Sequence, residues 1–150
     1  MKRLLIWGIA LFCAAAQAQL HVQRLDGSAV TLDAAHLATL PREAVQAQAH
    51  GKAVEVHAVD LREVLRAAGI EPPQKISGAA LRLVLVAGAR DGYAAAFSWA
   101  ELDPTLGGRR VFLVQDGPHA DAGPLRLVVP ADARPARWVR QLDSLRLVAP

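Results

Sequence analysis

The sequence predicts an α+β fold, a mixed or antiparallel β-sheet domain that carries short helices. Three observations point to it. Short stretches of alternating or continuous apolar residues recur along the whole chain, and turn-forming Asp-Gly pairs or single glycines separate many of them. The helical segments are few and short, and they begin at residues that cap helix N-termini. Many short strands with a few helices are typical of the α+β class.

The first half of the chain combines strands with two helices. Asp26-Gly27 is a tight-turn pair, Asp33 is a helix cap, and Asp60 with Glu63 has the spacing of a capping box. Gly69 follows the last apolar position of the second helix and ends it. We predict strands over 20–25, 28–32, 45–49 and 53–58, and helices over 33–40 and 60–68.

The second half opens after a Pro-rich loop over 69–78, which is too short to divide the chain into domains. Ser98 and Glu101 again have capping-box spacing and predict a short helix before Pro104. We predict strands over 81–87, 93–97, 111–115, 125–129 and 145–148, with a helical turn over 136–141. The pattern predicts one domain, residues 19–150.

Residues 1–18 have the parts of a secretory signal peptide. A basic start precedes an apolar run over 4–16, and small residues at the −3 and −1 positions predict cleavage between Ala18 and Gln19. The alternative is an uncleaved anchor, but the run is shorter than the ~20 residues of a membrane span. We therefore expect a protein of the bacterial periplasm or exterior, with no stable span after cleavage.

Cleavage would change both the charge and the sulfur chemistry of the chain. Residues 19–150 hold 15 basic and 14 acidic side chains, so the electrostatic argument for nucleic-acid binding is lost. The only cysteine, Cys13, lies in the leader. The predicted mature chain therefore has no disulfide, no thiolate nucleophile and no sulfur ligand for a metal.

The second half carries an ordered series of motifs. They are Asp91-Gly92-Tyr93, Phe97-Ser98, Glu101-Leu102, Asp116-Gly117, the run from Gly123-Pro124-Leu125-Arg126 to Pro130, and Arg137-Trp138-Val139. In order and spacing this series resembles the C-terminal part of the molybdopterin-binding domain of sulfite oxidase-type oxidoreductases. The first half resembles that domain more loosely, so the resemblance covers roughly residues 20–148. It implies the sulfite oxidase-type molybdopterin-binding fold.

In that family the fold carries a molybdenum pyranopterin cofactor. Arg137 and Trp138 match the family's basic-residue-plus-tryptophan motif, and Arg126 matches its Pro-Leu-Arg arginine. Asp91 and Tyr93 match its Asp-Gly-Tyr turn. The resemblance therefore implies these five residues as candidates for cofactor binding.

The chain departs from the family at the residue that binds the metal. A cysteine from the first half of the domain binds molybdenum in the enzymes, and residues 19–150 contain none. Ala122-Gly123 stands where the family has His-Gly. We therefore expect no catalytic residue, no metal ligand and no resident cofactor, although molybdopterin is the cofactor that the resemblance implies for this fold.

Each candidate also has a structural interpretation. Arg137 and Arg140 with Trp138 would suit an anion, since arginine pairs bidentately with phosphate or carboxylate, but Trp138 would equally fill the core beside solvated arginines. For Arg126 we expect solvation at a sheet edge. Asp91 and Tyr93 suit a turn whose tyrosine packs and hydrogen-bonds locally.

Other polar residues give weaker signals. His50 and His57 could face each other across a hairpin at Gly51, although ordinary strand positions explain both. Arg109-Arg110 follows Gly107-Gly108 and is typical of a solvated turn.

The leading hypothesis is an exported, non-catalytic binding or partner module, which takes an unidentified protein partner or a small anionic ligand. One alternative is a molybdopterin-dependent oxidoreductase or subunit without thiolate ligation, which the preference of such soft metals for thiolate disfavours. Another is a periplasmic small-anion receptor for a membrane sensor.

Overall fold

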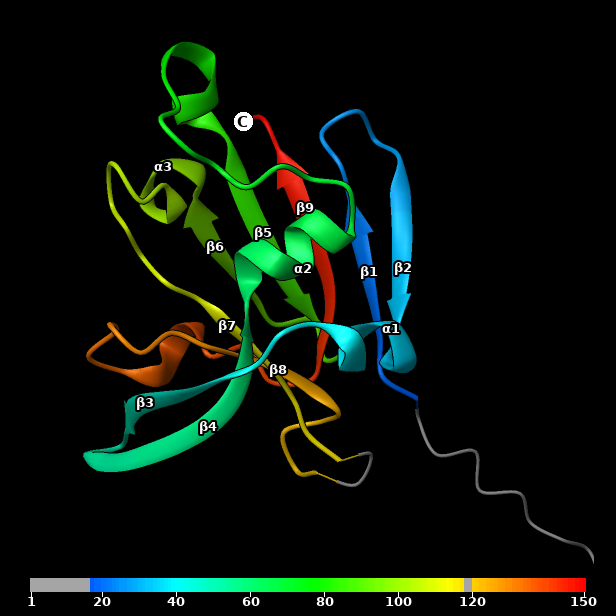
Figure 1. Cartoon of the computed structure of the whole chain (residues 1–150), viewed down its shortest axis with the longest axis vertical. Coiled ribbons are helices and arrows are strands. Elements are labelled where there is room, and N and C mark those ends of the chain that lie inside the picture. Colours follow the sequence, from blue (N-terminus) through cyan, green and yellow to red (C-terminus); the bar gives the residue numbers. More distant parts are fainter. Residues whose placement is uncertain (1–16, 118–119) are drawn as a thin grey trace, which may run out of the picture.

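The computed structural model describes residues 17–117 and 120–150, which form two β-sheets with short helices (Figure 1). The strands are β1 (Gln19–Gln23), β2 (Ala29–Asp33), β3 (Glu43–Ala49), β4 (Lys52–Asp60), β5 (Val84–Ala89), β6 (Ala94–Ser98), β7 (Phe112–Gln115), β8 (Leu125–Val128) and β9 (Leu142–Val148). The helices are α1 (Ala34–Thr39), α2 (Leu61–Ala67) and α3 (Trp99–Leu102), with 3-10 turns η1 (Gly78–Arg82) and η2 (Pro135–Arg137).

The two sheets differ in how their strands are ordered. The five-stranded sheet has the order β2-β1-β9-β5-β6, and the four-stranded sheet has the order β3-β4-β7-β8. Strands β1 and β9 run parallel, whereas the other paired strands are antiparallel. The predicted α+β class with mixed and antiparallel sheets is confirmed.

The predicted helix caps are present in α1 and α3. The Asp33 carboxylate accepts a hydrogen bond from the backbone N–H of His36 at 2.8 Å, which satisfies one free donor at the start of α1. The N–H of Ser98 donates to the Glu101 carboxylate at 3.0 Å in a capping box. These helices begin where their local sequence indicates.

Several predicted boundaries were wrong: the last strand begins at Leu142 rather than at 145, and two other errors have a clear local cause. The strand predicted over 81–87 begins only at Val84, because Gly78, at φ +58°, opens the 3-10 turn η1 instead. The helical turn predicted over 136–141 is the shorter η2, which starts at Pro135. In both places a residue with a restricted or unusual φ angle decides the local structure rather than the apolar pattern.

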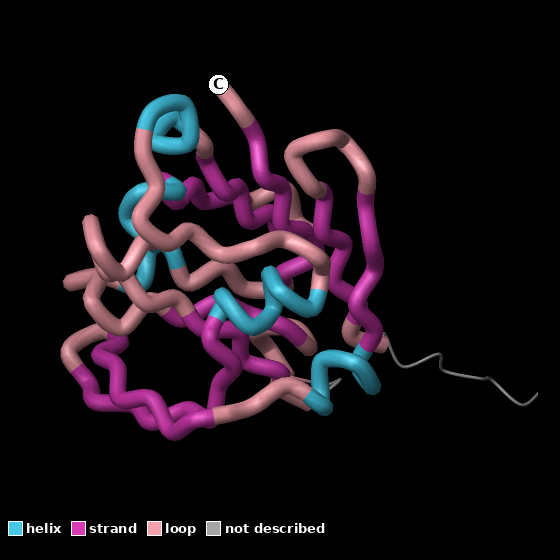
Figure 2. The backbone as a smooth tube through the Cα atoms, turned by 45° about the horizontal axis from the view of Figure 1, so that its top comes forward, coloured by secondary structure: helices cyan, strands magenta, loops and turns pink. Residues whose placement is uncertain are grey.

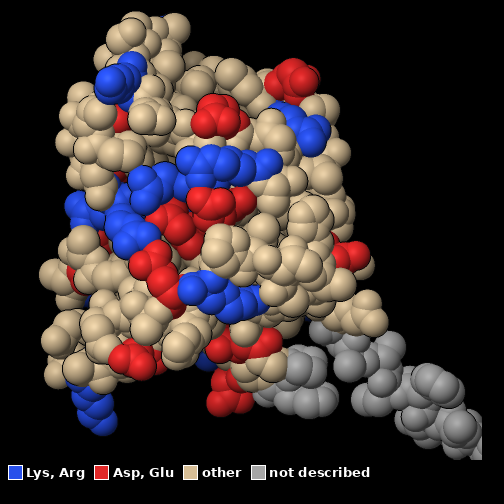
Figure 3. Space-filling view, in the orientation of Figure 1, with Lys and Arg blue, Asp and Glu red and all other residues tan. Residues whose placement is uncertain are grey.

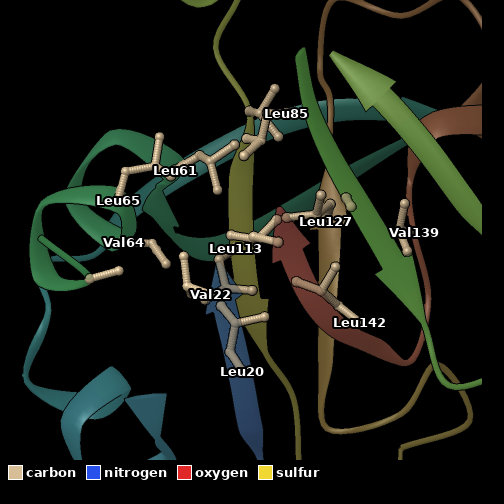
Figure 4. Close-up of a cluster of buried hydrophobic side chains, with 14 of the residues drawn as sticks. Leu20, Val22, Leu61, Val64, Leu65, Leu85, Leu113, Leu127, Val139 and Leu142 are labelled. Atoms are coloured by element: carbon tan, nitrogen blue, oxygen red, sulfur yellow. The ribbon is translucent and has the colours of Figure 1, made fainter. Parts of the chain in front are cut away.

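The main core lies between the five-stranded sheet, α2 and the inner ends of β7 and β8. Val64 of α2 lies close to Val22 of β1, and Leu113 of β7 lies between the two sheets (Figure 4). Each of these side chains is almost completely buried. Burying such an aliphatic side chain stabilises the fold by about 1.5–3 kcal/mol.

A smaller apolar cluster lies on one face of the four-stranded sheet. Val45 and Ala47 of β3 pack there with Phe112 and Val114 of β7 and with Val128 of β8. Ala58 of β4, the strand between β3 and β7, belongs to the same cluster. The β3–β4 hairpin forms one margin of the molecule, at lower left in Figure 2.

Asp103 anchors the loop before η1 to the end of α3. It is completely buried, and its carboxylate accepts hydrogen bonds from the N–H of Ile76 at 2.8 Å and from the N–H and hydroxyl of Thr105 at 2.7 and 2.8 Å. Burial alone would raise the pKa of Asp103, but these donors outweigh it and lower the pKa to about 2.

This carboxylate should make stability depend on pH in the acid range. Its folded pKa lies below the ordinary value of 3.8, so its contribution is complete above that value and is lost as the pH falls through about 2. We expect the urea midpoint to drop over this range, and the drop to be smaller in Asp103→Asn, which is also less stable at neutral pH. Parallel profiles for the two proteins would contradict this assignment.

The predicted leader mostly lies outside the described residues, and so does Cys13. Ala18, before the predicted cleavage point, is buried against the core, and Gln19 begins β1. Within residues 17–117 and 120–150, no helix has the length and apolar character to cross a membrane.

Candidate functional site

A cleft of about 990 Å³ opens where the β3–β4 turn approaches the segment around η2. Its wall includes the side chains of Arg126, Arg134, Arg140 and Trp138, which define what we call the arginine-lined cleft. Most of the remaining lining consists of alanines and a proline. An apolar floor with a few charged groups is the usual composition of a ligand site.

Trp138 joins the cleft to the interior. Its indole is half-buried, packs against both apolar clusters, and donates its Nε1–H to the carbonyl of Val129 at 3.1 Å. The two interpretations from the sequence are therefore compatible, because the ring fills the core and also lines the cleft.

Arg126 lies on β8, the edge strand that the sequence indicated, but the expectation of simple solvation was wrong. Its Nε donates to the Asp116 carboxylate at 2.6 Å, and both side chains are half-buried. Asp116, the residue just after β7, thus pairs with Arg126 in the middle of β8. An incoming anion would have to compete with this carboxylate for Arg126.

Arg134 and Arg140 differ from Arg126 because both are exposed at the cleft. Arg140 donates to the backbone carbonyl of Asp121 at 3.1 Å. Among the residues that the structure describes, no carboxylate forms an ion pair with either guanidinium. These two groups are the cleft's available positive charges.

Arg137 does not line the cleft and is held in an internal ion network. It donates to Asp132 at 2.8 and 2.9 Å and to Glu101 at 3.0 Å, and its guanidinium lies 4.8 Å from the centre of the Phe97 ring. Arg109 reaches the same two carboxylates at 3.4 and 3.8 Å, so the solvated turn expected at Arg109 was wrong. The hydrogen bond from Arg137 lowers the pKa of Asp132.

The Asp91-Gly92-Tyr93 turn forms as predicted, and its residues do not line the cleft. The N–H of Tyr93 donates to the Asp91 carboxylate at 3.0 Å, and Gly92 has φ +88°. The Tyr93 hydroxyl donates to the carbonyl of Ala136, so its bond reaches across to η2 rather than staying within the turn. This contact fixes the segment that carries Arg134 and Arg137.

The structure thus brings together only part of the predicted set. Arg126 and Trp138 meet in the cleft, whereas Arg137, Asp91 and Tyr93 do not line it. Sequence reasoning missed Arg134. No sequence pattern marked it, because its place in the cleft depends on the approach of the β3–β4 turn.

The two-histidine site is contradicted. His50 occupies the turn itself, at φ +51°, and the strand register places Ala44 rather than His50 opposite His57. Throughout residues 17–117 and 120–150, no three His, Cys, Asp or Glu side chains are placed to hold a metal ion. His50 instead lies at the rim of the arginine-lined cleft.

A second charged cluster lies over the face that carries α2, where basic and acidic side chains alternate (Figure 3). Asp60 caps α2 through the N–H of Arg62 and pairs with the Arg62 and Arg110 guanidiniums, both at 2.8 Å. Arg110 is exposed, as we expected, but it also pairs with Glu43. Glu63 binds Arg66 instead of completing the predicted capping box.

Comparison with known proteins identifies the fold. No protein-family model matches the chain, and no curated protein matches it. A solved structure that does match is the sulfane dehydrogenase SoxCD from Paracoccus pantotrophus, with a TM-score of 0.59 and 18% sequence identity over 87% of this chain. The fold is of the sulfite oxidase type. The match covers 38% of the SoxCD chain, so this protein corresponds to well under half of it.

The residues of this fold do not fit a molybdenum pyranopterin. The thiolate that such a metal favours is absent from residues 19–150. The two arginines that we had expected to contact the cofactor, Arg126 and Arg137, are both paired with carboxylates of the chain itself. The site is therefore a cleft on this fold with two arginines, Arg134 and Arg140, that form no ion pair with a carboxylate of the described chain.

Proposed function

We propose that this protein is an exported, non-catalytic binding module that takes an anionic ligand in the arginine-lined cleft. The observation that carries the proposal is the contrast between its arginines. Arg126 and Arg137 are neutralised internally, whereas Arg134 and Arg140 are exposed and have no carboxylate partner in the described chain.

The chemistry of the lining supports an organic anion. Guanidinium groups pair bidentately with carboxylate or phosphate, and the alanines and Trp138 offer apolar surface for the rest of the ligand. The fold similarity to SoxCD supports a relationship to a molybdopterin oxidoreductase component, but the donor set of this chain supports binding rather than redox catalysis.

The cleft arginines can be tested with two probes, inorganic phosphate and citrate. We expect citrate to shift backbone amide NMR signals within residues 133–140. Citrate should bind more tightly than phosphate, because it carries several carboxylates on an organic frame whereas phosphate is one small anion. The double substitution Arg134→Ala with Arg140→Ala should weaken citrate binding about tenfold or more, equivalent to losing about 1.4 kcal/mol or more.

The double substitution Arg82→Ala with Arg146→Ala is the charge-matched control, because both are exposed arginines that do not line the cleft. It should leave citrate binding unchanged. Equal losses in the control and the cleft variant would mean that only net charge matters, and the proposal would fail.

Metal analysis separates this function from that of an oxidoreductase. Protein purified from molybdenum-replete cells should contain molybdenum far below one atom per chain and show no pterin fluorescence. Stoichiometric molybdenum with pterin would establish the enzyme alternative instead.

A further inference from the structure

Strand β3 is an edge strand whose outer backbone groups are available for pairing. In a hairpin with a two-residue turn, the residues that flank the turn form a hydrogen-bonded pair, and such pairs alternate along the ladder. Ala49 pairs with Lys52 across this turn, so the N–H and C=O of Ala44, Gln46 and Gln48 point away from β4. Within the described part of the chain, no other segment forms backbone hydrogen bonds with β3.

Two cavities lie at the two ends of β3, and neighbouring parts of one segment, residues 130–136, line both of them on the opposite side. The arginine-lined cleft takes Ala49 from one end of β3 and residues 133–136 from the opposite wall. A second cavity of about 600 Å³ takes residues 43–46 from the other end and Pro130 with Ala131 from that wall. The segment over residues 130–136, orange in Figure 1, thus lies opposite the two ends of β3.

The composition of β3 distinguishes its edge from a protected one. Natural edge strands discourage pairing with charged side chains, especially lysine, or with proline. The other strand of the hairpin follows this rule with Lys52, Glu55 and His57. By contrast, β3 from Ala44 to Ala49 carries no charge and no proline.

We propose that an extended peptide segment of a partner protein adds to the edge of β3, with a carboxylate at the end that lies against Arg134 and Arg140. The seven residues of β3 span roughly 23 Å at about 3.3 Å each, enough for one strand to connect the two cavities. This inference rests on the proposed function and names the anionic ligand as an acidic peptide.

The residues of β3 indicate how apolar and polar side chains should alternate in that peptide. Side chains of an added strand alternate between two faces, as those of β3 do. One set would continue the apolar face of Val45 and Ala47, and the other would lie beside the exposed Gln46 and Gln48. Backbone hydrogen bonds would supply affinity, and the carboxylate near Arg134 would fix direction.

The test is selection from a phage-displayed library of random peptides on the purified protein, followed by hydrogen–deuterium exchange with an enriched peptide. We expect enriched sequences to alternate apolar and polar residues and to carry Asp or Glu at one end. Exchange at the amides of Ala44, Gln46 and Gln48 should slow when the peptide is bound.

Two proline variants of one cross-strand pair make the test specific. Gln46 and Glu55 are opposite each other, outside the hydrogen-bonded positions, and their side chains contact each other. Gln46→Pro removes a donor on the free edge of β3, whereas Glu55→Pro removes the equivalent donor on β4. We expect the first to abolish peptide binding and the second to preserve it, with circular dichroism showing that both proteins are folded.

Other outcomes would overturn the inference. Absence of enriched peptides, or equal binding by the two proline variants, would show that β3 is not the docking edge. A dimer in analytical ultracentrifugation that Gln46→Pro dissolves would assign the edge to a second copy of the chain. If citrate binds but no peptide does, the inference about β3 fails while the proposed anion-binding function is retained.

Discussion

Replacing Gly107 with alanine should lower the free energy of unfolding by about 3 kcal/mol, near the upper end for overpacked sites. A Cβ at position 107 would lie 2.5 Å from the Cα of Glu101 and 2.7 Å from its carbonyl oxygen. Both atoms belong to the backbone of α3, so no flexible side chain can move aside. The contact would displace Glu101, which also pairs with Arg137.

Urea denaturation measures this effect, and Gly117→Ala provides the control. A Cβ at Gly117 would meet no atom within 4 Å in the part of the chain that the structure describes, so that variant should stay within about 0.5 kcal/mol of the parent. If Gly107→Ala were equally well tolerated, the close approach of the loop to α3 would be absent in solution.

Arg137→Ala should lower the free energy of unfolding by about 2 kcal/mol. The substitution removes three charge-assisted hydrogen bonds to Asp132 and Glu101, and it uncovers the ring of Phe97. The two half-buried carboxylates would retain only Arg109, which is more distant. An arginine reserved for a ligand would instead cost little stability when removed.

Arg137→Lys should recover part of the loss, because lysine keeps the charge but lacks the planar fork that bonds two oxygens at once. Arg134→Ala is the comparison at the cleft and should be nearly neutral in the same denaturation experiment. A neutral Arg137→Ala would contradict the internal network and restore Arg137 as a candidate ligand-binding residue.

The sequence predicts much of this fold because many of its signals are local. Asp33 and Ser98 cap the helices that follow them, and these interactions span only three residues. The Asp91-Gly92 turn is equally local. The strand predicted to start at 81 failed because the geometry of Gly78 overrode the apolar pattern.

The site was predictable only in part, because charge pairing is decided by tertiary contacts. Arg137 and Glu101 are 36 positions apart in the sequence, and Arg110 and Glu43 are 67 apart. Neither pair leaves a pattern in one sequence. Trp138 and Arg126 were found through a motif, whereas Arg134 acquires its importance only when the hairpin turn at His50 closes one side of the cleft.

The parallel pairing of β1 with β9 has a consequence for how the chain acquires its structure. Val22 lies beside Leu145, so the middle of the five-stranded sheet joins the first strand to the last. Contacts this distant in sequence carry a large loop-closure entropy and slow folding. While the chain is being synthesised, β1 can pair with β2, but its other edge has no partner until β9 emerges. Completion of this sheet should therefore be a late step in folding, and truncation within β9 should leave one edge of β1 unpaired while its pairing with β2 remains.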